Sequence, residues 1–159
     1  MQWYDYYIRC WKHYFDFKGR ARRAEWIIFV ACNRTIHNLC KYIGELEGNV
    51  AIIVSVVALL FGLVTFIPEV AVCVRRLHDV GKTGWWMTLP VLLAITTYVF
   101  LFVFQLEKVG IALSAAYGVT MICLIIVSIK DGQPGVNKWG PNPKEKNNTL
   151  QISKEKNTE

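Results

Sequence analysis

Charge is scarce over long stretches of this chain. Of its 159 residues only 19% are charged and 53% are hydrophobic, whereas about a quarter of the residues in a soluble domain are usually charged. Three stretches without any charge, 51–68, 83–106 and 109–129, are 18, 24 and 21 residues long. Because a membrane-spanning helix needs about 20 residues, the sequence predicts an all-α integral membrane protein and excludes a water-soluble enzyme core.

The usual signatures of a disulfide framework, a metal site or a cofactor are also lacking. The five cysteines are scattered and form no C-x-x-C pair, and the three histidines share no metal-ligand spacing. Gly81-Lys82-Thr83 superficially resembles a phosphate-binding loop. However, Arg76 stands where that loop needs its first glycine, and a membrane helix precedes it instead of a strand. We therefore expect no metal, no cofactor, no nucleic acid partner and no complete catalytic constellation.

Residues 1–25 form a basic, aromatic leader. They contain no apolar stretch of about 7–15 residues, so we expect no secretory signal peptide. On a helix one face would carry Trp3, Tyr7, Trp11 and Tyr14, and the other Asp5, Arg9, Lys12 and Asp16. This pattern predicts a helix lying in the lipid headgroup layer. It fits equally well a helix packed into a small cytoplasmic cap.

Residues 26–43 begin as an apolar segment and then acquire a polar stripe. The stripe recurs at spacings of three and four and consists of Asn33, Arg34, His37, Asn38 and Lys41. A membrane span with a buried polar stripe fits this pattern, and so does a second interfacial helix. Hydropathy does not separate the two alternatives.

The distribution of Lys and Arg favours the span. Basic residues in short loops mark the cytoplasmic side of a membrane, and they gather in 9–23, in 75–82 and after residue 129. The connections at 41–48 and 107–108 are poor in net positive charge. Counting 26–43 as a span places all three basic regions inside. We therefore predict a four-helix transmembrane bundle with spans at about 26–43, 49–74, 85–106 and 109–129, and both termini in the cytoplasm.

Prolines and short connections set further details of this bundle. We expect Pro68 to interrupt the second span and Pro90 to lie in the first turns of the third. The short connection between the last two spans predicts an antiparallel hairpin. Residues 131–143 are rich in Gly, Pro and Asn and are expected to form an ordered inner loop, whereas the polar composition of 144–159 predicts a disordered tail.

Three sequence stretches together carry a family resemblance. They are FDFKGRARR at 15–23, RRLHDVGKTGWW at 75–86 and GVNKWGPNP at 135–143. In this order, around hydrophobic helices, they resemble the domain-of-unknown-function 805 family of small bacterial inner-membrane proteins. The resemblance implies a location in the bacterial cytoplasmic (inner) membrane and a short multi-helix fold. It implies no activity, since none is assigned to that family.

The middle stretch is the densest motif of the chain. Gly81 and Gly84 would permit a tight reversal after the second span, and Trp85 and Trp86 would anchor the third span at the interface. His78 and Asp79 are candidates for an acid/base or orienting pair. The alternative, which we favour, is a capping aspartate beside a surface histidine, because no nucleophile or metal partner accompanies the pair.

The cytoplasmic ends of the spans are predicted to form a basic rim. Its residues are Arg20, Arg22, Arg23, Arg75, Arg76 and Lys82. Each such charge contributes about 1 kcal/mol near an anionic lipid surface. We expect the rim to contact anionic lipid headgroups or a membrane-protein partner.

Small residues form two helical stripes that allow close helix packing in lipid. The stripe of the second span is Ala51, Ser55, Ala58, Gly62 and Thr65, and that of the last span is Gly110, Ser114 and Gly118. Either both stripes pack the bundle internally or one of them serves a homo-oligomer, and internal packing is the commoner use.

Continuing the first of these stripes leads to Glu69. At 1.5 Å per residue, Glu69 lies about 9 Å inside the Arg75 end of its helix, and Arg34 about 16 Å from the Arg23 end of its own. An isolated charge inside a membrane costs at least about 2.5 kcal/mol. We therefore predict that Arg34 and Glu69 pair within the bundle. Alternatively, Glu69 reaches the inner surface or pairs with Arg76.

These observations favour a small structural or binding protein of the cytoplasmic membrane that is not an enzyme. A second hypothesis is a small transporter or channel whose path is lined by Arg34, His37, Asn38, Lys41 and Glu69, although no inverted repeat is visible. A membrane enzyme that uses His78 and Asp79 comes third.

Overall fold

The described part of the chain is helical. The computed structural model describes residues 2–44 and 49–144, and these contain no strand beyond one antiparallel bridge between Asn137 and Gly140. The helices are α1 (Trp3–Lys12), α2 (Arg23–Gly44), α3 (Asn49–Asp79), α4 (Thr88–Tyr98) and α5 (Glu107–Ile129). A 3-10 turn (Gly84–Met87) precedes α4, and a π-helical turn (Val99–Val103) continues it. The all-α prediction is confirmed.

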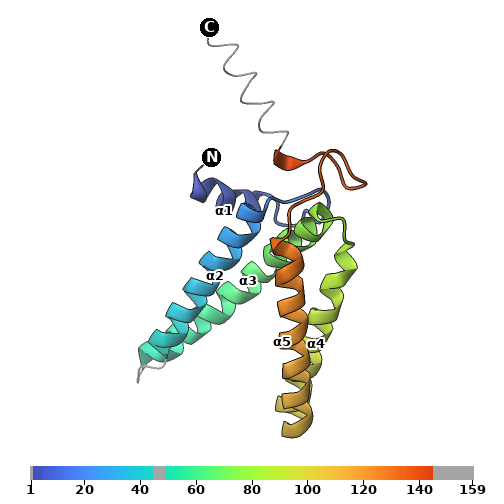
Figure 1. The fold of residues 1–159 in the computed structure, drawn as a ribbon. Coiled ribbons are helices and arrows are strands. Elements are labelled where there is room, and N and C mark those ends of the chain that lie inside the picture. Colours follow the sequence, from blue (N-terminus) through green and yellow to red (C-terminus); the bar gives the residue numbers. More distant parts are fainter. Residues whose placement is uncertain (1, 45–48, 145–159) are drawn as a thin grey trace.

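The long helices form two antiparallel pairs that diverge from one junction (Figure 1). The pair α2–α3 leads away from this junction in one direction, and the pair α4–α5 leads away in another. The C-terminal ends of α3 and α5 meet there, and α1 and the segment 131–144 lie over it. We call this part of the molecule, comprising residues 2–25, 75–87 and 130–144, the charged end. The long helices are thus arranged as two diverging pairs, and the four-helix transmembrane bundle stays a prediction.

In the described part of the chain, three helices are long and apolar enough to cross a membrane: Asn49–Asp79, Gly84–Val103 and Glu107–Ile129. Their outward apolar side chains are exposed, as lipid-facing residues must be. Leu59 and Leu63 on α3, for example, are each 63% exposed. α2 does not meet the same hydropathy criterion because of its polar stripe, so the fourth span stays a prediction. The predicted tail, 144–159, lies outside the described residues except for Lys144.

The aromatic face of α1 packs against α2 and α3. Cys10, Phe29 and Val72 are fully buried together, with Tyr7 and Trp11 packed around them. The Tyr7 ring lies 5.2 Å from the Phe29 ring, and its hydroxyl donates to Asn33 Oδ1 at 3.2 Å. Of the two sequence alternatives for the leader, this packing corresponds to the helix of a small cap. A place for α1 in the headgroup layer stays a prediction.

α3 is longer than predicted and is not interrupted at Pro68. It continues beyond residue 74 to Asp79, with Pro68 buried in its interior. A proline lacks the N–H that would bond the carbonyl four residues earlier, here that of Val64. The Tyr14 hydroxyl donates to this Val64 oxygen at 2.6 Å. The leader therefore supplies the hydrogen bond that Pro68 removes, and α3 continues past Pro68 without interruption.

The small-residue stripes contribute to packing within the chain. A Cβ on Gly62 would come within 3.0 Å of the His37 ring of α2, and a Cβ on Gly110 would collide with the Leu101 side chain. Gly118 has no neighbour at its Cβ position among the described residues. Pro90 lies in the first turn of α4, where no intrahelical N–H is needed.

The Tyr14–Val64 hydrogen bond can be tested by a double-mutant cycle. Because Tyr14→Phe leaves the Val64 carbonyl without its donor, we expect it to lower the free energy of unfolding by about 1 kcal/mol. In a Pro68→Ala background the restored N–H of residue 68 bonds Val64, so the same change should cost almost nothing. Reversible unfolding in mixed detergent micelles measures both effects, with Tyr4→Phe as the control. Equal costs in the two backgrounds would contradict the assignment.

Candidate functional site

The charged end is organised around one buried carboxylate. Arg20 Nε donates to Asp79 Oδ1 at 2.8 Å, and Arg76 Nη1 donates to Asp79 Oδ2. The two arginine side chains are 1% exposed and the aspartate side chain 5%. One negative charge thus lies between two positive charges in the interior. We call Arg20, Arg76 and Asp79 the arginine cluster.

The remaining N–H groups of the cluster bond backbone carbonyls from distant parts of the chain. Arg76 Nε donates to Ser128 O at 2.8 Å and its Nη2 to Lys130 O, both at the C-terminal end of α5. Arg20 Nη1 donates to Gly135 O at 2.7 Å in the loop that follows. Buried guanidinium groups are tolerated only when paired and hydrogen-bonded. The cluster therefore holds the leader, α3, α5 and the loop in one place.

The loop after α5 approaches the cluster at a glycine. A Cβ on Gly132 would collide with the Asp79 carboxylate. The next residue, Gln133, donates its backbone N–H to Asp79 O at 2.8 Å, which satisfies one carbonyl at the end of α3. Sequence analysis did not single out Gly132, because its role depends on a neighbour 53 positions away.

A second buried ion pair lies beside the first. Glu25 accepts a hydrogen bond from Arg75 Nη1 at 3.0 Å and lies 3.7 Å from Arg9 Nε. Next to it, burial, with a smaller contribution from the Glu25 charge, raises the pKa of the Cys10 thiol to about 12. Cys10 is therefore a neutral packing group and not a nucleophile. Glu25 is the sole acid in the basic stretch 18–25, a signal that could have marked it as a partner.

His78 and Asp79 do not act on each other. The His78 ring stacks on Trp139 with centroids 4.6 Å apart, and its Nδ1 lies 3.2 Å from the Gly19 carbonyl oxygen. The Asp79 carboxylate is occupied by the two guanidinium groups. The structure therefore separates the two candidates for an acid/base or orienting pair into a stacked ring and an ion-pair centre at the end of α3. The alternative that we favoured is also corrected, because His78 is only 8% exposed and is not a surface histidine, and Asp79 ends a helix and does not lie on a loop.

Three of the six predicted rim residues are interior. Arg20, Arg75 and Arg76 are 7%, 3% and 1% exposed, so the structure corrects their assignment to an exposed rim. The physical reason is that carboxylates pair with them inside the protein. Asp79 pairs with Arg20 of the leader and with Arg76 on its own helix, and Glu25 of α2 pairs with Arg75.

The other three rim residues lie at the surface. Arg22 donates to Pro143 O at 3.1 Å, and Arg23 pairs with Asp131 at 2.6 Å. The Asp131 carboxyl has a pKa below its usual value because Lys144 donates a hydrogen bond to it and the Arg23 charge lies close. Lys82 is exposed, with its Nζ 5.6 Å from the centroid of the Trp86 ring.

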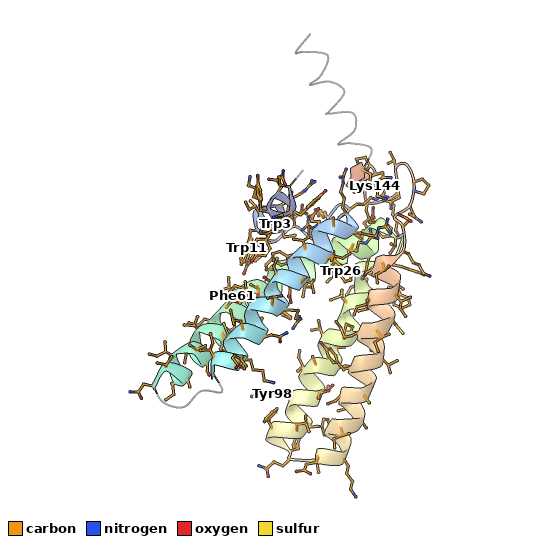
Figure 2. The ribbon with its side chains drawn as sticks, turned by 60° about the vertical axis from the view of Figure 1, so that its left-hand side comes forward. Trp3, Trp11, Trp26, Phe61, Tyr98 and Lys144 are labelled. Atoms are coloured by element: carbon orange, nitrogen blue, oxygen red, sulfur yellow. The ribbon has the colours of Figure 1, made fainter. Side chains whose placement is uncertain are left out.

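Exposed cations and aromatic rings surround the arginine cluster. Sequence analysis did not place Lys18, Lys130 or Lys138 on the rim, yet all three are exposed. The exposed aromatic residues of this end are Trp3, Phe15, Trp85 and Trp86, at 63%, 72%, 80% and 52%. Figure 2 shows Trp3 at the charged end and Tyr98 toward the far end of α4.

The predicted intramembrane pair is present. Arg34 Nη2 lies 3.5 Å from Glu69 Oε2, with the two side chains 61% and 18% exposed. Both line a cleft of about 560 Å³ between the two helix pairs. Of the other residues on the predicted transport path, Asn38 and Lys41 are exposed and His37 packs 5.5 Å from the Phe61 ring. The cleft is not lined by His37, Phe61 or Lys41.

Comparison with known proteins assigns the chain to a family. The profile of the family described as "Protein of unknown function (DUF805)" matches residues 14–141. The chain belongs to the DUF805 family. Within it, the chain is similar to "Inner membrane protein YhaH" of Escherichia coli K12, 29% identical over 145 residues, which are 88% of this chain and 97% of the relative. It is also similar to "Inner membrane protein YhaI" of the same strain, 28% identical over 144 residues, 91% and 97% of the two chains.

No solved structure matches the chain significantly. The DUF805 assignment covers the arginine cluster, the stacked His78 and Trp139, and both helix pairs. Together with the three apolar helices, it makes the chain a membrane protein of a family without an assigned activity.

The Asp79 carboxylate is expected to dominate the stability of the charged end. Asp79→Asn leaves two buried guanidinium groups without a counter-charge, which should lower the free energy of unfolding by about 3–5 kcal/mol. The matched control is Asp131→Asn, whose carboxylate is 72% exposed and pairs with Arg23, and should cost less than about 1 kcal/mol. Unfolding in detergent measures both variants. Similar losses for both would show that the cluster does not hold the fold together.

Proposed function

We propose that this protein is a small structural or binding protein of the bacterial cytoplasmic membrane, whose basic, aromatic end binds anionic lipid headgroups from the cytoplasmic side. The observation that carries the proposal is the gathering of exposed lysines and aromatic rings at the charged end. Within residues 2–25, 75–87 and 130–144 there are twelve Lys and Arg against five Asp and Glu. Positive residues favour the cytoplasmic side, and the two relatives carry the name inner membrane protein.

Packing supports α2 as a fourth span. α2 lies antiparallel along α3 (Figure 1), and it has 22 residues. At 1.5 Å per residue it is about 33 Å long, similar to the roughly 30 Å of a hydrocarbon core. Because α3 is apolar enough to span, its partner along the same length shares the same depth. Four spans return both ends of the bundle to the cytoplasmic side.

Lipid binding by the charged end follows from exposed groups only. Lys12, Lys18 and Lys82 are exposed cations, and tryptophans such as Trp85 are typical of the headgroup level. The buried arginines satisfy their charge internally and add nothing to headgroup contact. The exposed lysines are therefore the residues that recruit anionic lipid, at about 1 kcal/mol each.

The topology is tested by cysteine labelling in a variant without native cysteines. Single changes Lys18→Cys, Lys108→Cys and Lys130→Cys place one thiol in the leader, one between α4 and α5, and one after α5. With a membrane-impermeant maleimide on intact spheroplasts, we expect Lys108→Cys to react at once, and the other two only after permeabilisation. A leader thiol that reacts in intact cells, beside a protected thiol at 130, would remove α2 from the spans.

The lipid contact is tested by the lipids that accompany the purified protein. The triple variant Lys12→Gln, Lys18→Gln, Lys82→Gln should lose anionic lipid, since three charges near the surface together account for about a hundredfold in affinity at most. The control is Lys41→Gln with Lys108→Gln, at the opposite ends of the helices. Mass spectrometry gives the ratio of anionic to zwitterionic lipid, expected to fall several-fold in the triple variant alone. An unchanged ratio would refute headgroup binding by this face.

A further inference from the structure

The cleft between the two helix pairs has the form of a binding site. It has a volume of about 560 Å³, within the range of about 300–1,000 Å³ found for small-molecule sites. Toward the charged end it is lined by Leu77, Leu124 and Ser128, the last of which accepts a hydrogen bond from Arg76. Away from that end the helix pairs diverge (Figure 1). A ligand would therefore enter from the membrane and stop below the arginine cluster.

Besides Ser128, three polar side chains from three helices line this otherwise apolar space. Arg34 comes from α2, Glu69 from α3 and Tyr117 from α5. Around them are apolar residues and two further aromatic rings, Trp26 and Phe66. A few convergent polar groups in an apolar pocket are the usual composition of a ligand site.

The polar groups have hydrogen-bonding capacity to spare. The contact of Arg34 with Glu69 involves one guanidinium nitrogen at 3.5 Å, the outer limit for a hydrogen bond. The Tyr117 hydroxyl has no hydrogen-bond partner among the described residues. The Trp26 indole N–H faces the Cys73 sulfur at 3.3 Å, which is a weak acceptor. Besides the Glu69 carboxylate, which is needed to compensate the Arg34 charge, the spare groups are donors, namely the remaining Arg34 N–H groups and the Tyr117 hydroxyl, and these suit a ligand with acceptor oxygens.

Depth and charge restrict the ligand further. Arg34 lies eleven residues beyond Arg23, about 16 Å along the helix axis, which is below the level of phospholipid headgroups if α2 spans the membrane. Arg34 and Glu69 together carry no net charge, so a charged ligand would leave an uncompensated charge at that depth, which is costly. The complementary molecule is an uncharged lipophile with carbonyl oxygens. A flat ring would fit the aromatic side chains that line the cleft from three helices.

We propose that this cleft binds a lipid-soluble quinone, a neutral ring with carbonyl acceptors and an apolar tail. Arg34 and Tyr117 donate to its carbonyl oxygens, Glu69 holds the guanidinium in place, and the tail leaves between the diverging helix pairs. The inference rests on the proposed four-span topology. The labelling experiment above tests that topology separately, so the failure of one is distinguishable from the failure of the other.

The test is a titration of the purified full-length protein in detergent with decylubiquinone, read by native mass spectrometry. We expect one saturably bound molecule per chain. Tyr117→Phe removes only a hydroxyl and should weaken binding about threefold to tenfold. Arg34→Met should weaken it at least tenfold. Tyr98→Phe is the matched control, because the Tyr98 ring lies 4.9 Å from the Phe102 ring and outside the cleft.

Three results would overturn the proposal. The first is binding that does not saturate, and the second is equal affinity in Tyr117→Phe and Tyr98→Phe. The third is displacement of the quinone by an equal concentration of monoolein, a neutral lipid with an ester carbonyl but no ring. If Arg34→Met does not fold, as judged by its melting temperature, the Tyr117→Phe result alone decides.

Discussion

The fold depends on one carboxylate shared between two arginines. Asp79 ends the longest helix, and its two partners come from the leader and from the preceding turn of the same helix. Because these guanidinium groups also bond carbonyls at the end of α5 and in the following loop, four separate parts of the chain share one electrostatic centre. Removing a partner from such a centre costs more than the centre itself contributes, since the remaining charges stay buried.

This centre also brings together the three stretches that resemble the family, although they lie far apart in sequence. Residues 15–23 contribute Arg20, 75–86 contribute Arg76 and Asp79, and 135–143 contribute the Gly135 carbonyl. His78 and Trp139 join the last two stretches by a stacked contact. The motifs of this DUF805 protein thus meet at a structural junction, and their polar residues are used mainly for each other.

The sequence allowed the prediction of features that depend on local spacing. Uncharged runs predict the apolar helices, and the depths of Arg34 and Glu69 on two neighbouring helices, which differ by no more than an arginine side chain can bridge, predict their proximity. Features that depend on distant partners were not predictable in this way. A count of basic residues cannot tell the buried Arg76 from the exposed Lys82, because the difference is made by Asp79 and by carbonyls more than fifty positions away. Pro68 was expected to interrupt α3 for the same reason, since the compensating hydroxyl belongs to Tyr14.

The two helix pairs touch each other mainly near the charged end, where α3 meets α5 and the turn at 84–87. Mechanically, each pair is an arm of about 30 Å fixed at a single joint. A rotation of about 10° at that joint would move the far ends by about 5 Å relative to each other, while every contact within a pair stays unchanged. The width of the space between the arms therefore depends on the charged end, where the joint lies.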